Sequence, residues 1–182
     1  MKINNRIKFF FGILFFFFMA LNVNSSALAI EDEVVSRVLG GLKAVFLDVA
    51  PVSPVIKEKG LTSEKLKADI EQKLQDAGIN VIPEQEYQRL KRTPRYPLCR
   101  LELFVHAVEI QDKGVMNFYI VLQVQQAAYL SRNYTIKISA PTWEKGELSY
   151  SYGSSVDSIP KVVRTLTDKF IKAFLEANKE NK

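Results

Sequence analysis

The sequence is poor in the residues that hydrolases and metal sites most often use. Its 182 residues include one cysteine, Cys99, one histidine, His106, and one tryptophan. A single cysteine excludes an internal disulfide, so an exported domain of this size would rely on its hydrophobic core. A Ser-His-Asp or Cys-His arrangement would have to use His106, and no G-x-S-x-G elbow is present to expose a nucleophilic serine. We therefore predict no catalytic residue and a non-enzymatic protein.

Metal and nucleotide motifs are also missing. The sequence has no C-x-x-C or H-E-x-x-H pattern, and the densest acidic run, Glu31-Asp32-Glu33, fits the start of a helix better than a calcium site. Gly40-Gly41 precedes a predicted strand, whereas a dinucleotide-binding loop follows one. The sequence thus predicts no metal and no cofactor. Two carboxylates can converge in any fold, but nothing here singles out a pair.

The first 29 residues have the pattern of a secretory signal peptide. Lys2, Arg6 and Lys8 form a basic start, a long apolar run begins at Phe9, and Ala27-Leu28-Ala29 fits the small-x-small cleavage rule. We predict cleavage after Ala29 and a periplasmic or secreted location. The alternative is a retained membrane anchor, but the apolar run is shorter than the roughly 20 residues that span a bilayer, which favours cleavage. No cysteine lies near the cleavage site, which excludes a lipoprotein anchor.

The charge of the chain changes once this segment is removed. The full sequence has 25 basic and 20 acidic residues, and three of the basic residues belong to the signal peptide. The predicted mature chain, residues 30–182, therefore has 22 basic and 20 acidic residues, a net charge of +2. Because the basic character belongs largely to the export segment, a nucleic-acid partner is disfavoured.

Residues 100–128 predict one long β-hairpin around which the domain is organised. Apolar and mixed side chains alternate with the period of two that marks a strand, first up to Ile110 and again from Val115, and Gln111-Asp112-Lys113-Gly114 supplies the turn. One face of the hairpin should be buried under helices, and its large apolar residues are Leu101, Leu103, Val105, Met116, Phe118, Ile120, Leu122 and Val124.

The other elements follow from periodicity and from breaker residues. Before the hairpin we predict a short helix over 31–39, a strand over 42–50, a loop over 51–60, a helix over 61–78, a short parallel strand over 79–82 and a short helix over 84–91. Thr62 should cap the longer helix and Gly78 should end it. After the hairpin we predict strands over 134–139 and 147–152, a turn over 141–146 that carries Trp143, and a long helix capped by Ser158.

Together these elements predict a single α+β domain over residues 30–182, with a frayed C-terminal tail. Its sheet should be mixed but mainly antiparallel, with one face covered by the two long helices, because helix–strand crossovers and hairpins alternate along the chain. Two surfaces could bind a partner. One is the mixed face of the hairpin, with Asn117, Tyr119, Gln123 and Gln125, and the other is a basic loop with Arg89, Arg92 and Arg95.

A short motif resembles bacterial envelope proteins. Leu66, Ile70 and Leu74 precede Ala77-Gly78-Ile79, so a helix ends in Ala-Gly and leads into a short strand. In order of elements the chain is similar to the N-terminal domain of TolB and to small LpoB-like and CsgG-like domains. Ala140-Pro141-Thr142-Trp143 followed by Gly146, and a helix ending near Phe170 and Phe174-Leu175, also resemble an uncharacterised family of small exported bacterial proteins. The resemblance implies an α+β sandwich that contacts other envelope components, and it supplies no catalytic residues.

We therefore expect a periplasmic or secreted binding or accessory protein, with an envelope protein or an anionic envelope polymer as its partner. The oligomeric state is left open. The alternative is a small hydrolase or small-ligand carrier with a pocket between the sheet and the helices, because that is where a fold of this class can enclose a ligand.

Overall fold

The computed structural model describes residues 37–93, 97–110, 113–153 and 155–179 of the chain. The predicted signal peptide, Arg95, the Gln111-Asp112 half of the hairpin turn and residues 180–182 lie outside the described residues. The elements in chain order are β1 (Ala44–Val49), α2 (Pro54–Glu58), α3 (Ser63–Asp76), α4 (Glu84–Leu90), β2 (Leu98–Ile110), β3 (Val115–Leu130), β4 (Asn133–Tyr152) and α5 (Ser158–Ala177).

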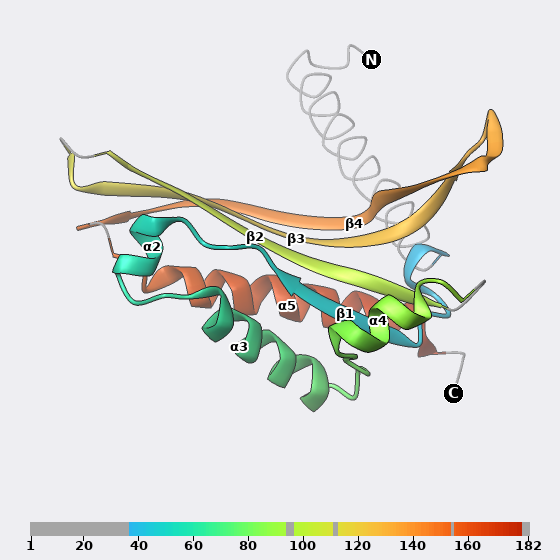
Figure 1. Cartoon of the computed structure of the whole chain (residues 1–182). Coiled ribbons are helices and arrows are strands. Elements are labelled where there is room, and N and C mark those ends of the chain that lie inside the picture. The colour runs from blue at the N-terminus through green and yellow to red at the C-terminus, as the bar shows by residue number, and fades with distance from the viewer. Residues whose placement is uncertain (1–36, 94–96, 111–112, 154, 180–182) are drawn as a thin grey trace, which may run out of the picture.

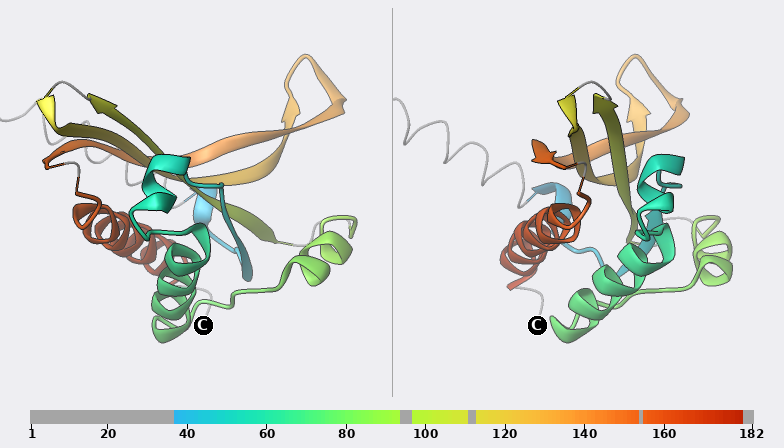
Figure 2. Two further views of the ribbon diagram at one scale, coloured as in Figure 1. Left: turned by 60° about the vertical axis from the view of Figure 1, so that its left-hand side comes forward. Right: turned by 90° about the vertical axis from the view of Figure 1, so that its left-hand side faces the viewer.

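The four strands form one sheet in the order β1-β2-β3-β4. β1 and β2 are parallel, whereas β2–β3 and β3–β4 are antiparallel. Helices α3 and α5 lie side by side against one face of this sheet, here called the inner face (Figures 1 and 2). The predicted α+β class, the mixed and mainly antiparallel sheet and its cover of two long helices are confirmed.

The hydrophobic core lies between the inner face and these two helices. The predicted apolar rows of β2 and β3 are buried there together with the apolar stripes of α3 and α5, and burying each large side chain contributes roughly 1.5–3 kcal/mol. Two ion pairs join the helices on the solvent side: Lys73 Nζ lies 2.7 Å from Asp168 Oδ1, and Arg164 Nη2 lies 2.7 Å from Asp69 Oδ2. The buried rows are Leu101, Leu103, Val105, Met116, Phe118, Ile120, Leu122 and Val124.

Both predicted ends of α3 are confirmed. The Thr62 side chain accepts a hydrogen bond from the Lys65 backbone N–H. At the other end Gly78 has φ +75°, and the backbone N–H groups of Gly78 and Ile79 donate to the carbonyls of Gln75 and Leu74. This is the Schellman arrangement, which glycine adopts without a Cβ clash. The predicted strand over 79–82 is reduced to one parallel bridge between Val81 and Val45.

The predicted turn over 141–146 is wrong. β4 is a single strand of 20 residues, and Trp143 is a buried residue in its middle, paired with Val124. Its ring packs on Phe170 of α5, with ring centroids 5.4 Å apart. The prediction took Pro141 as a turn residue, but proline is also tolerated in an edge strand and beside a bulge. The register indeed shifts at this point, from Val124–Trp143 to Gln125–Pro141.

Two smaller predictions are also wrong. The predicted loop over 51–60 contains the short helix α2, which Pro54 starts because proline suits a first helical position, and Ile56 of this helix is buried in the core. Ser158 is the first residue of α5, and Asp157 precedes it as N-cap residue. The chain already turns before Ser158, since the Ile159 N–H donates to the Val156 carbonyl at 3.1 Å.

Strands β3 and β4 continue beyond the helices as a two-stranded arm, which we define as residues 126–140 (Figures 1 and 2). Its base is attached to the body through Gln126, whose side-chain amide donates to the Val38 carbonyl at 2.7 Å and to Thr142 Oγ1 at 2.9 Å. The bulge next to this base bends the strand, and the arm turns away from the helices in both figures.

Candidate functional site

The predicted site residues of the hairpin all lie on the outer face of the sheet, opposite α3 and α5. Asn117, Tyr119 and Gln123 stand in register with Tyr150, Leu148 and Glu144 of β4. The outer face has three zones along its length: an aromatic patch near the β2–β3 turn, a polar network in the middle and a groove beside α4. Each zone contains at least one of the predicted residues, so the predicted residues do not form one site.

We define the aromatic patch as Val108, Tyr119, Leu148, Tyr150 and Tyr152. These side chains are 42–76% exposed although they are large and mostly apolar. The rings of Tyr150 and Tyr152 meet edge to face with centroids 5.5 Å apart. The Tyr119 side chain lies over Gly146, where an added Cβ would stand 3.0 Å from the Tyr119 hydroxyl oxygen and 3.2–3.3 Å from two ring carbons. The patch thus lies on neighbouring strands of the face that α3 and α5 leave uncovered.

The inner side of β3 beneath the patch is buried. Met116, Phe118 and Ile120 surround the patch residue Tyr119 along β3 and are at most 1% exposed. The backbone beneath the patch is therefore held by core packing. A partner would meet a surface that is already ordered, which lowers the entropy lost on binding.

The middle zone is an ionic network in which Arg100 is central. The Arg100 guanidinium contacts the Asp48 carboxylate and donates from Nη1 to Glu102 Oε1 at 2.9 Å. Glu102 is 7% exposed, and its other oxygen accepts a hydrogen bond from Gln123 Nε2 at 2.8 Å. Gln123, a predicted binding residue, is therefore used to satisfy a buried carboxylate, as a buried charge requires.

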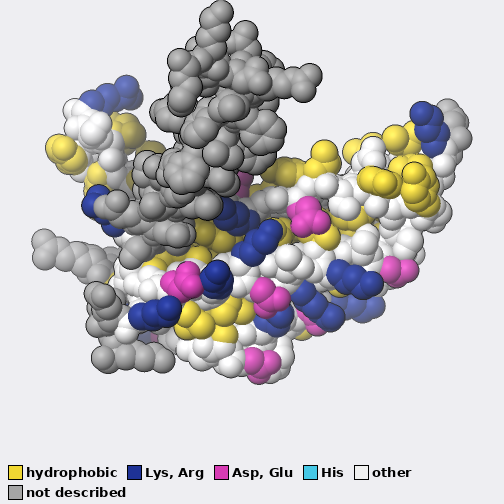
Figure 3. All heavy atoms as spheres, turned by 180° about the vertical axis from the view of Figure 1, so that it is seen from behind, with side chains coloured by type: hydrophobic (Ala, Val, Ile, Leu, Met, Phe, Trp, Pro, Cys, Tyr) yellow, Lys and Arg dark blue, Asp and Glu magenta, His cyan; other side chains and the backbone are white. Residues whose placement is uncertain are grey.

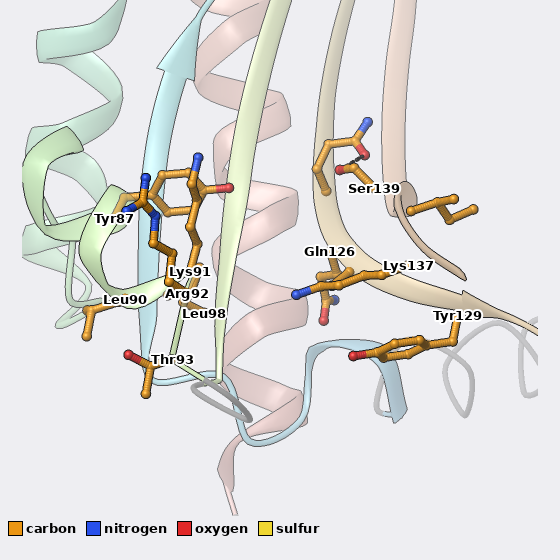
Figure 4. Close-up of a pocket in the computed structure, with 13 residues that line it drawn as sticks. Tyr87, Leu90, Lys91, Arg92, Thr93, Leu98, Gln126, Tyr129, Lys137 and Ser139 are labelled. Atoms are coloured by element: carbon orange, nitrogen blue, oxygen red, sulfur yellow. Dashed lines mark hydrogen bonds between the residues drawn. The ribbon is translucent and has the colours of Figure 1, made fainter. Parts of the chain in front are cut away.

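The third zone is an open groove of about 820 Å³ between α4 and the base of the arm (Figure 4). Lys91 and Arg92, at the end of α4, face Lys137 of β4 across it. Gln125, a predicted binding residue, also lines the groove. Lys91 Nζ also lies 5.7 Å from the centroid of the Tyr87 ring. Among the described residues, three cationic side chains and no carboxylate line the groove, so it favours an anionic group. The remaining lining residues are Tyr87, Leu90, Thr93, Leu98, Gln126, Ala127, Tyr129, Ile138 and Ser139.

The structure divides the predicted basic loop. Arg92 lines the groove, whereas Arg89 is not one of its lining residues. Arg89 instead forms an exposed i,i+3 ion pair on α4, with its Nη2 3.6 Å from Glu86 Oε1. Arg95 lies outside the described residues. Sequence reasoning missed Lys137, which lies 45 positions after Arg92 and reaches the groove only because β4 folds back along β3. No local signal links these two residues.

The single histidine and the single cysteine of the chain differ in exposure. His106 is exposed on the outer face and stacks on Phe104, with ring centroids 6.4 Å apart. Cys99 is buried in the core, and this burial raises the pKa of its thiol to about 12. Cys99 therefore packs as a small buried hydrophobic residue. The space between sheet and helices, where the alternative function needs a pocket, holds the hydrophobic core.

Within the described ranges, no three His, Cys, Asp or Glu side chains come together as a metal site, and no helix is both long and apolar enough to cross a membrane. No family model matches the chain, and a search of the curated proteins finds no match. The resemblance to envelope proteins therefore stays a prediction.

Proposed function

We propose that the protein is a non-enzymatic, exported binding or accessory module, which contacts another component of the cell envelope through the outer face of its sheet. The aromatic patch is the observation that carries this proposal. Contiguous exposed apolar side chains on a soluble domain mark interaction surfaces, and tyrosine is enriched in protein interfaces because it combines a large apolar ring with a polar hydroxyl. The preferred partner is therefore an envelope protein.

The cationic groove supports a second point of contact for the same partner. Lys91, Arg92 and Lys137 would attract an acidic segment, and complementary charge contributes chiefly to specificity and to the rate of association. The polar network separates the groove from the patch along the outer face. A partner that reaches both zones would have to lie along the sheet.

Site-specific photo-crosslinking in the producing cell tests the proposal. A photoreactive phenylalanine analogue at Val108 is expected to capture one dominant protein, and the same analogue at Lys161, exposed on α5, is expected not to capture it. Leu148→Lys places a charge in the centre of the patch. Since Leu148 is 76% exposed, this change should abolish the adduct at Val108 without changing the unfolding midpoint.

Arg92→Glu tests the groove separately. We expect it to slow the appearance of the Val108 adduct, with a larger effect at low ionic strength, because steering by exposed charges is screened by salt. Equal capture from Val108 and Lys161, or an adduct that Leu148→Lys leaves intact, would refute the proposal.

A further inference from the structure

The arm consists of two strands, the ends of β3 and β4 that meet at the turn near Arg132. It is paired in register from Gln126–Ala140 to Tyr129–Lys137, and the register then shifts to Leu130–Asn133 before the turn at its end. Gln126 attaches its base to the body. A two-stranded ribbon buries too little surface to be stable in water by itself. Neither α3 nor α5 reaches it in Figure 1 or Figure 2.

Its side chains are large, apolar and exposed. Tyr134 is 75% exposed, Tyr129 57%, Ile136 43% and Ile138 41%. Tyr134, Ile136 and Ile138 occupy alternate positions of β4. Ile138 pairs with Ala128, whereas Tyr134 and Ile136 lie where the register shifts, between Lys137 and Asn133. Tyr129 stands on the opposite face from Ile138, next to its register partner Lys137.

All formal charges of the arm are positive. Residues 125–142 include Arg132 and Lys137 and no aspartate or glutamate. Arg132 lies in the turn at the very end of the arm, and no described carboxylate forms an ion pair with either side chain. In Figure 3 the arm, at the upper left, shows hydrophobic and basic side chains and no acidic one on the visible side. Across the groove at its base lie Lys91 and Arg92, which extend the same positive field.

We propose that the arm docks on an anionic phospholipid bilayer and inserts Tyr134 and Ile136 into the interfacial layer. Tyrosine rings settle at the boundary between headgroups and acyl chains, aliphatic side chains enter that boundary, and Lys and Arg remain at the phosphates. The absence of acidic residues suits a negatively charged surface in particular. This inference is independent of the proposed protein contact, since it uses the opposite end of the sheet from the aromatic patch.

Vesicle co-sedimentation of the full chain tests this inference. The probes are vesicles of phosphatidylglycerol and phosphatidylcholine in equal parts, and vesicles of phosphatidylcholine alone. Because Arg132 and Lys137 lie close to the surface, the mixed vesicles should bind roughly thirtyfold more tightly. The charge reversal R132E/K137E should remove this preference, whereas the conservative change R132K/K137R should keep it.

The double variant Y134S/I136S removes two apolar side chains from the arm and is expected to weaken binding at least about tenfold. Its matched control, V108S/L148S, removes two exposed apolar side chains from the aromatic patch, 67% and 76% exposed, and should bind like the unchanged chain. All variants share the same N-terminal segment, so differences between them report the arm.

A spectroscopic readout locates the contact directly. A tryptophan introduced by Tyr134→Trp should show a blue shift of its emission on the mixed vesicles, whereas Leu148→Trp should show none. Arm variants that bind like the unchanged chain, equal binding to neutral vesicles, or an unshifted emission from position 134 would each overturn the inference.

Discussion

Replacement of Phe170 by alanine should destabilise the protein strongly. Phe170 is fully buried on α5, and its ring contacts Trp143 of β4 at 5.4 Å and Phe174 at 5.7 Å between centroids. Phe→Ala changes in a packed core typically cost about 3–5 kcal/mol, because the lost burial is joined by an unfilled cavity. In a domain of this size, each kcal/mol lowers the melting temperature by about 2–4 °C, so a decrease of roughly 6–20 °C is expected.

Urea denaturation followed by circular dichroism and by Trp143 fluorescence measures this effect. The variant retains Trp143, the only tryptophan of the chain, so its native emission should shift to longer wavelength as the indole loses its ring contact. Leu148→Ala is the matched control, because its side chain is 76% exposed and its loss should change stability by less than about 0.5 kcal/mol. A loss below about 1 kcal/mol for Phe170→Ala would refute the packing of α5 against Trp143.

Three further predictions concern other parts of the fold. Iodoacetamide should label Cys99 at pH 8 only after unfolding, since burial keeps its thiol pKa near 12. An unfolded thiol loses its proton near pH 8.5, so the stability difference between the unchanged chain and Cys99→Ala should decline as pH rises from there towards 12 in pH-dependent urea titrations. Arg100→Met should cost about 1–2 kcal/mol in urea denaturation because it leaves the buried Glu102 short of a partner, and adding Glu102→Leu should restore most of that loss. Gly78→Ala should cost about 1 kcal/mol in the same assay, because its φ of +75° is strained for any side chain.

Local patterns of the sequence predicted the best-formed elements. The alternation along β2 and β3 identified the buried row correctly, because a strand with one buried face must repeat every two residues. The ends of α3 were predicted at Thr62 and Gly78, because capping depends on groups within a few positions of each other.

The errors arose where a local signal competed with tertiary structure. Pro141 and Gly146 suggest a turn, yet β4 passes through both residues, since one stands beside a bulge and the other lies under the Tyr119 ring. Pro51 and Pro54 suggest a loop, but Ile56 is drawn into the core and α2 forms around it. In each case a contact with a distant residue outweighed the local preference.

The candidate site shows the same division. The sequence by itself determined that Asn117, Tyr119, Gln123 and Gln125 share the face of the hairpin that α3 and α5 do not cover, because side-chain direction follows from position in a strand. Only the tertiary structure decided that Gln123 belongs to the Arg100 network and that Arg92 and Lys137 line one groove. It also decided that β3 and β4 extend beyond the helices and form an arm with basic and apolar side chains. These outcomes depend on strand register and on where the helices end, and both are set by packing between residues that are far apart in the chain.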